Sequence, residues 1–207
     1  MAKESLLTTL AQQRPGDLDR LSKQSIQWLT NKIQNLKGLS AVPGAIAREE
    51  MRHQNKFMLG CLYYFYYDPK GKDDLPYYDK FPLVLALEKY PDGFLGLNLH
   101  YLPLKYRVAF MGKLMDYATY TPDNEIKRLR VTYDILQASK RFKEFKPCIK
   151  RYLHGHIKSK ILTVAPNEWE VALVLPVHQF KGAKPQDVWQ DSVNEIRGTD
   201  RTFGSIS

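Results

Sequence analysis

The sequence predicts an α+β fold, in which several helices pack on a small antiparallel β-sheet or partly open barrel and an N-terminal helical arm precedes this core. Three apolar runs support the sheet: residues 57–67, 81–87 and 94–101 are short and rich in aromatic and aliphatic side chains, as strands are. Turn-forming residues separate the runs at 68–71 and 91–93, and the Asp-Gly pair in the second turn suits a hairpin because glycine accepts a positive φ. Apolar residues at helical spacing on both sides of this segment complete the prediction.

The arm is predicted from residues 17–37, where leucines and Trp28 recur at helical spacing while basic residues occupy the other side. Two interpretations stay open: the helix docks on its own core, or it packs on another subunit or along nucleic acid. Residues 38–56 contain Gly and Pro before a short polar stretch, which is typical of a linker. The predicted organisation is a tail and arm over 1–45, one α+β core domain over 46–200, and a tail over 201–207.

Five further elements are predicted after the sheet segment. Apolar stripes predict a helix over 103–118 and a second one over 121–139, which opens on a Thr-Pro-Asp start signal. A further short helix is expected within 148–162. Residues 169–175 form an apolar run that ends at a proline, and we expect a strand there that returns to the sheet. The pattern over 184–197 predicts a final helix.

The charge balance points to a polyanionic partner. The chain has 207 residues, a formal net charge of +9 and a pI of about 9.4, which favours nucleic acid as the partner, although a merely soluble basic domain fits equally well. Cys61 and Cys148 have no neighbours at metal-ligand spacing, so we expect reduced thiols and synthesis in a reducing cytoplasm. No run of about 18 apolar residues occurs, and the N-terminus lacks the pattern of a signal peptide, so no membrane partner is expected.

The positive charge is concentrated in residues 127–160. This basic window holds eleven basic and only two acidic residues, so its excess of nine positive charges equals the formal net charge of the whole chain. A DNA binder without sequence preference needs such a cluster, because neutralised phosphates release condensed counterions. The predicted nucleic-acid-binding residues are Lys127, Arg128, Arg130, Lys140, Arg141, Lys143, Lys146, Lys150, Arg151, Lys158 and Lys160.

Aromatic residues suggest two further contacts, and their roles stay open. Phe142, Phe145 and Tyr152 lie among the cations and could stack on bases at an exposed DNA end, or they could pack inside the core. The three Tyr-Tyr pairs within residues 63–78 are expected to point one ring inward and one outward, since neighbours on a strand face opposite sides. The outward rings could form an interface or a nucleic-acid platform, or simply a half-buried sheet face.

No pattern predicts catalysis, a metal site or a cofactor. The His-Gly-His triplet at 154–156 could bind a metal, but no third ligand lies at a suitable spacing. The acids Asp68, Asp73, Asp74 and Asp79 flank the predicted strands, and a metal-dependent nuclease would need them to converge beside a lysine. Turn acids usually face solvent or cap backbone amides, so we expect no catalytic residue and no metal. No phosphate-binding glycine loop occurs either.

Six stretches of the sequence resemble one family of phage proteins. They are FYYDPK, LPYYDKFPLV, DGFLGLNLHYLP, VTYDIL, FKPCIKRYL and WEVALVLPV, which together fall roughly within residues 57–180. On these stretches the chain resembles the DNA end protector family of large contractile-tailed phages, also described as DNA-terminus or head-completion proteins. No catalytic motif comes with this resemblance.

The resemblance implies a non-enzymatic virion protein that is made in the host cytoplasm. Such a protein would bind double-stranded DNA ends without sequence preference, protect them from host exonuclease, and complete the head and neck in contact with head, neck or portal proteins. The open alternative is a purely structural neck, portal or baseplate protein, whose basic window meets acidic protein neighbours. The affinity for linear duplex DNA distinguishes the two functions: an end binder should bind at low salt, and its affinity should fall steeply as the salt concentration rises.

Overall fold

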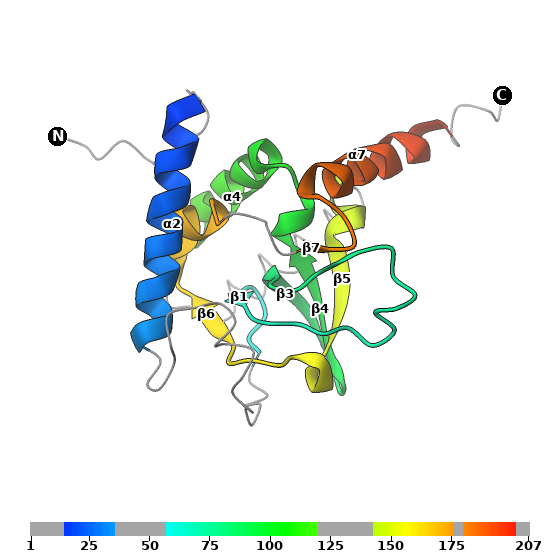
Figure 1. The fold of residues 1–207 in the computed structure, drawn as a ribbon, viewed down its shortest axis with the longest axis horizontal. Helices are drawn as coiled ribbons and strands as arrows, with labels where there is room; N and C mark the ends of the chain where they lie inside the picture. The colour runs from blue at the N-terminus through cyan, green and yellow to red at the C-terminus, as the bar shows by residue number, and fades with distance from the viewer. Residues whose placement is uncertain (1–14, 36–56, 120–142, 176–179, 202–207) are drawn as a thin grey trace.

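The structure is a computed structural model that describes residues 15–35, 57–119, 143–175 and 180–201 (Figure 1). Its centre is a five-stranded antiparallel sheet with the strand order β5-β4-β3-β1-β6. The sheet is open, with β5 and β6 at its edges, and does not close into a barrel. The strands are β1 Leu62–Tyr64, β3 Leu83–Tyr90, β4 Gly93–Asn98, β5 Ile149–Leu153 and β6 Leu162–Val164.

Helices and a second, two-stranded sheet surround this centre. The two-stranded sheet pairs β2 (Tyr78–Asp79) with β7 (Phe180–Lys181). The α-helices are α2 Pro15–Asn35, α4 Leu104–Thr119, α6 Trp169–Leu173 and α7 Pro185–Arg201. Short 3-10 turns are η1 Leu99–Tyr101, η2 Lys143–Cys148, η3 His154–His156 and η4 Pro166–Glu168. None of the helices in the described part of the chain is long and apolar enough to span a membrane.

Several predicted elements are confirmed. The apolar runs on either side of the Asp-Gly turn form the β3–β4 hairpin, with Tyr90 opposite Gly93 at the turn. The predicted helices over 103–118 and 184–197 are α4 and α7. The run 57–67 is regular strand only over β1. The predicted helix over 121–139 lies outside the described residues.

The predicted strand over 169–175 is wrong, because these residues form helix α6 and the turn after it. The Trp169 indole Nε1 donates a hydrogen bond to the Val164 carbonyl at 3.1 Å, which holds the start of the helix against the end of β6. A short apolar run has no periodicity that separates a buried helix from a buried strand. The strand that completes this side of the sheet is β6, where Leu162 pairs with Tyr64 of β1.

The short helix expected within 148–162 is wrong as well, because this segment forms β5, η3 and β6. Strand β5 pairs with β4, with Tyr152 opposite Phe94 and Ile149 opposite Leu97. Its sequence, IKRYL, places two cations in the middle of five residues, and these cations obscure the alternation that a strand leaves in a sequence.

Both faces of the central sheet are covered. On one face, Leu62, Leu85 and Leu97 pack in the larger core with side chains from α2, α4, α6 and α7. On the other face lies a smaller aromatic core, defined by Phe57, Tyr63, Phe65, Tyr67, Val84, Ala86, Phe94, Tyr152 and Ile157. Burial on both faces explains why β3 opens with five consecutive buried residues instead of an alternating pattern.

The aromatic core corrects the expectation of outward tyrosines at the first pair. Tyr63 and Tyr64 do point to opposite faces, but they are 3% and 5% exposed, because each face has its own cover. Tyr67 is also buried, and its hydroxyl oxygen accepts a hydrogen bond from the Leu153 amide at 3.2 Å. The chain after β1 therefore curls over the sheet and contacts β5, so these tyrosine rings form no surface platform.

Helix α2 packs on helix α6 of its own chain (Figure 1). Leu21 and Leu29 join the larger core, and the Ser25 hydroxyl donates to the Val171 carbonyl at 2.6 Å. At the other end of this contact, Glu168 accepts from the Trp28 indole at 3.2 Å and pairs with Lys32. Of the two interpretations left open, docking on its own core is the one that describes residues 15–35. The division of the chain into an arm over 1–45 and a core stays a prediction.

Candidate nucleic-acid interface

The structure describes six of the eleven predicted nucleic-acid-binding residues. Lys127, Arg128, Arg130, Lys140 and Arg141 lie outside the described residues. Lys143 begins η2, Lys146 follows in the same turn, Lys150 and Arg151 are neighbours on β5, and Lys158 and Lys160 lie between η3 and β6. The described cations therefore follow one edge strand and the segment that leads from it to the opposite edge of the sheet.

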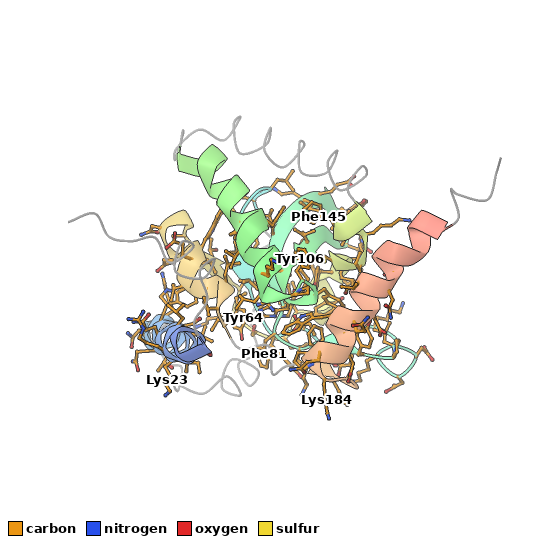
Figure 2. All side chains as sticks on the ribbon, turned by 90° about the horizontal axis from the view of Figure 1, so that it is seen from above. Lys23, Tyr64, Phe81, Tyr106, Phe145 and Lys184 are labelled. Carbon is orange, nitrogen blue, oxygen red and sulfur yellow. The ribbon has the colours of Figure 1, made fainter. Side chains whose placement is uncertain are left out.

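Lys146 is exposed on η2, a turn that packs chiefly against helix α7. Its neighbour Phe145 is half-buried, and the Phe145 ring lies 4.7 Å from the ring of Phe110 on α4. Figure 2 shows Phe145 and Tyr106 on the side of the molecule that α4 and η2 share. Phe145 thus packs against the larger core, one of the two roles left open for it, while Lys146 is exposed.

Lys150 and Arg151 are separated by the geometry of the strand, since neighbouring side chains point to opposite faces. Lys150 is half-buried, with its Nζ 4.4 Å from the centre of the Tyr101 ring, and burial lowers the pKa of this ammonium group. Arg151 is at the surface, where it pairs with Asp92 and its guanidinium carbon lies 3.7 Å from the centre of the Tyr90 ring. The two cations cannot contribute to one continuous surface.

Lys158 and Lys160 follow the chain away from β5. The His154 amide donates to the Asp92 carbonyl at 2.9 Å, so the segment passes beside the β3–β4 turn. Lys158 is exposed, and its Nζ donates to the Gly155 carbonyl at 2.7 Å, whereas Lys160 is half-buried. Arg151 and Lys158 thus lie near the hairpin turn, while Lys146 lies beyond the other end of β5.

Of the two roles left open for Tyr152, packing inside the core is the one that the structure shows. The Tyr152 ring is buried in the aromatic core, 4.9 Å from Tyr67 and 5.3 Å from Phe94. Burial raises the pKa of its phenol well above the usual value, and the phenol is hydrogen-bonded to the Asn98 side chain. Phe142 lies outside the described residues, so its role stays a prediction.

A buried polar cluster at the open end of the β3–β4 hairpin was missed from the sequence. Asp79 is its centre: one carboxylate oxygen accepts from the Phe81 amide at 3.0 Å, and the other accepts from Asn98 Nδ2 at 3.0 Å and lies 2.9 Å from His100 Nδ1. Since a carboxylate oxygen accepts, this geometry fits the His100 tautomer that carries its proton on Nδ1. The sequence around Asp79 contains no pattern that predicts burial of this carboxylate.

Arg107 on α4 lies near this cluster, and it is only 2% exposed. Its Nε donates to the Leu102 carbonyl at 2.9 Å and its Nη1 donates to the Leu173 carbonyl at 3.1 Å, so the guanidinium joins α4 to the end of α6. Burial lowers the pKa of Arg107 to about 10, and the nearby Asp79 opposes this shift, so the side chain stays charged at neutral pH. Burial likewise lowers the pKa of His100, and the ring stays neutral.

This buried cluster is closed to substrates, since Asp79 and His100 are both less than a tenth exposed. The other acids considered in the sequence do not converge on it: Asp68 pairs with Lys72, and Asp73 and Asp74 face solvent. Among the described residues, no group of three or more His, Cys, Asp or Glu side chains could hold a metal ion. The arrangement supports packing and leaves the surface cations as the candidate site.

The sequence matches one known protein family over most of its length. No curated protein and no solved structure matches it. The family described as "Phage T4 terminal DNA protecting protein" matches residues 20–192, from the first half of α2 into α7. Both cores, the hairpin and the described cations of the basic window fall inside this span. The match covers most of the sequence, and the chain therefore belongs to the family of phage T4 terminal DNA protecting proteins.

Proposed function

We propose that this protein binds the ends of packaged duplex DNA without sequence preference, blocks exonuclease entry there, and completes the phage head or neck as a virion component. The observation that supports this most is the basic window: in a chain of a DNA-terminus protecting family, the formal charge excess of the whole protein falls within residues 127–160.

Phosphate contacts supply the affinity in this proposal. Lys146 and Lys158 are exposed, and neither lies beside an acidic side chain in an ion pair among the described residues. Lysines of this kind act as point charges on the DNA backbone and carry no sequence information by themselves. The aromatic side chains that could have read bases are largely packed in the two cores. Binding with little base readout follows from this division of roles.

The first experiment measures affinity for an open and a closed end. A fluorescent blunt duplex is compared with the same duplex closed at both ends by hairpin loops, across a salt series, with the purified full chain. We expect tighter binding to the open duplex. The logarithm of the binding constant should fall linearly with the logarithm of the salt concentration, by roughly 0.9 for each phosphate contact. No binding at low salt would support the purely structural virion protein instead, and equal affinity for both duplexes would contradict binding at DNA ends.

The second experiment locates the contacts by charge reversal. The triple variant Lys140→Glu, Arg141→Glu, Lys143→Glu should weaken DNA binding by about tenfold or more and reduce the salt slope. The matched control reverses three exposed lysines outside the basic window, Lys70, Lys181 and Lys184, and thus makes the same change in net charge. If the control loses as much affinity as the window variant, net charge and not the window drives binding.

The third experiment tests protection itself. Linear DNA is incubated with a processive exonuclease in the presence of wild-type protein, the window variant or the control variant, and the surviving length is measured. Wild type and control should preserve the DNA, while the window variant should not. A density map of the phage particle that places this chain away from the DNA terminus would contradict the head or neck position.

A further inference from the structure

An end protector needs a feature that recognises ends, because phosphate neutralisation is the same at every position along a duplex. An open end differs from internal DNA by the exposed face of its terminal base pair. Proteins bind exposed base faces by stacking aromatic rings or guanidinium planes on them. A surface aromatic group that is fixed in position is therefore the feature to look for.

Among the side chains whose exposure the structure describes, two aromatic rings are exposed: Tyr90 at 37% and Tyr106 at 53%. Tyr106 lies in the first turns of α4, on the side of a helix, and its ring has no aromatic or cation contact among the described residues (Figure 2). Tyr90 is the last residue of β3, directly before the hairpin turn. Tyr90 has a guanidinium against its ring, so Tyr90 is the exposed aromatic side chain that is fixed in position.

Two contacts hold the Tyr90 side chain in place before any ligand arrives. The Arg151 guanidinium lies 3.7 Å from the ring centre, and Arg151 in turn pairs with Asp92 in the turn. The Tyr90 hydroxyl is hydrogen-bonded to Glu88, which raises the pKa of Tyr90. A side chain that is ordered in advance loses less conformational entropy when it binds.

The hairpin turn that carries Tyr90 is itself fixed by β5. The Asp92 carbonyl accepts from the His154 amide at 2.9 Å, and Gly93 lies so close to Tyr152 that a Cβ at this position would overlap the Tyr152 carbonyl oxygen. In Figure 1 the turn lies at the lower edge of the molecule, next to residues 154–156. Tyr90 is thus presented at the edge of the protein on a backbone that β5 and the residue after it hold in place.

The charges of the residues at the turn largely offset one another. Lys89 and Arg151 are matched by Glu88 and Asp92, which leaves Lys158 as the exposed cation of the basic window nearby. The geometry points to stacking: we propose that Tyr90, with Arg151 against its ring, stacks on the terminal base pair and gives the protein its preference for DNA ends. This inference rests on the proposed function and names the group that distinguishes an end from internal DNA.

The test compares Tyr90→Ala with Tyr90→Phe and with the control Tyr106→Ala, all in the full chain. Tyr90→Ala should lose affinity for the blunt duplex by about tenfold, as expected for one aromatic–base stack, and should bind open and hairpin-closed duplexes alike. Its salt slope should equal that of wild type, because no phosphate contact is removed. Tyr90→Phe and Tyr106→Ala should keep the preference for the open end.

A spectroscopic signal checks stacking directly. The fluorescence of 2-aminopurine in the terminal base pair should change when wild-type protein binds and should change far less with Tyr90→Ala, while the same probe inside the duplex should respond equally to both. If wild type prefers open ends and Tyr90→Ala keeps that preference, this inference fails and the proposed function stands. If wild type itself does not distinguish open from closed duplexes, the proposed function fails first. Equal loss of preference in Tyr106→Ala would overturn the assignment to Tyr90.

Discussion

The two ends of the β3–β4 hairpin carry similar chemistry in opposite surroundings. At the open end, Asp79 contacts Asn98 and His100 inside the protein, with the charged Arg107 nearby. At the turn, Asp92 contacts Arg151, which stacks on Tyr90 at the surface. An aspartate with its charged and hydrogen-bonding neighbours therefore stabilises the fold where water is excluded. The same kind of group remains available to a ligand where water has access. Four changes test this difference.

The largest effect is expected from Asp79→Ala. The variant removes a carboxylate that accepts three hydrogen bonds and leaves the buried Arg107 charge without its nearby anion, which costs about 3–5 kcal/mol of unfolding free energy. Urea unfolding followed by circular dichroism measures the loss. The control is Asp73→Ala, an exposed acid in the preceding loop, which should change stability by less than about 0.5 kcal/mol. Similar losses of unfolding free energy in both variants would show that the buried position of Asp79 is not what makes it important for stability.

A backbone change at the turn should come second. Gly93→Ala places a Cβ against the Tyr152 carbonyl, so β4 and β5 must separate, at a cost of about 1–3 kcal/mol. The matched control is Gly155→Ala, because a Cβ there meets nothing within 4 Å. Thermal unfolding should separate the two variants clearly. An unchanged melting temperature in Gly93→Ala would mean that the turn is not held by β5 as described.

A pH dependence should follow from His100. Burial lowers the pKa of this ring in the folded protein, so on acidification the unfolded chain takes up the proton first. The stability tied to neutral His100 is therefore complete above the ordinary histidine pKa of about 6.5 and is lost as the pH falls below it. His100→Asn keeps a donor for Asp79 but cannot be protonated, and its melting temperature should fall less between about pH 7.5 and about pH 5.5 than that of wild type. Parallel pH profiles would exclude His100 as the cause.

The smallest effect is expected from Asp92→Ala. The Arg151–Asp92 pair is exposed to water, and such pairs contribute about 0–1 kcal/mol, so unfolding by urea should change little. The small difference should shrink further at high salt, because ions screen surface charges. A loss as large as that of Asp79→Ala would show that the turn, too, is a stabilising cluster.

The hairpin was predictable because two strong local signals agree there, a pair of apolar runs and the Asp-Gly turn between them. Helices α4 and α7 were predictable from their periodicity. The run 169–175 was not, because its apolar residues have no alternation, and its helix is stabilised by a hydrogen bond from Trp169 to Val164 that only the fold creates. Strand β6 is three residues long and exists through its pairing with β1.

The candidate site was predictable in charge but not in geometry. The sequence locates the cations, yet it cannot show that Lys150 turns toward Tyr101 while Arg151 turns toward Tyr90. The Arg151–Asp92 pair joins residues 59 positions apart, and the Asp79 cluster joins segments that only the completed sheet brings together. Contacts of this kind depend on tertiary packing, so no local sequence pattern predicts them.

The order of strands in the sheet has a consequence for how the protein forms. Strands β1, β3 and β4 leave the ribosome first, whereas their outer partners β6 and β5 are synthesised much later in the chain. Until residues 149–164 emerge, a nascent three-stranded sheet has two open edges and an uncovered aromatic face, and both promote aggregation. Messages truncated before β5 should therefore yield insoluble fragments, and chaperones that bind the newly made chain should matter most during that interval of translation.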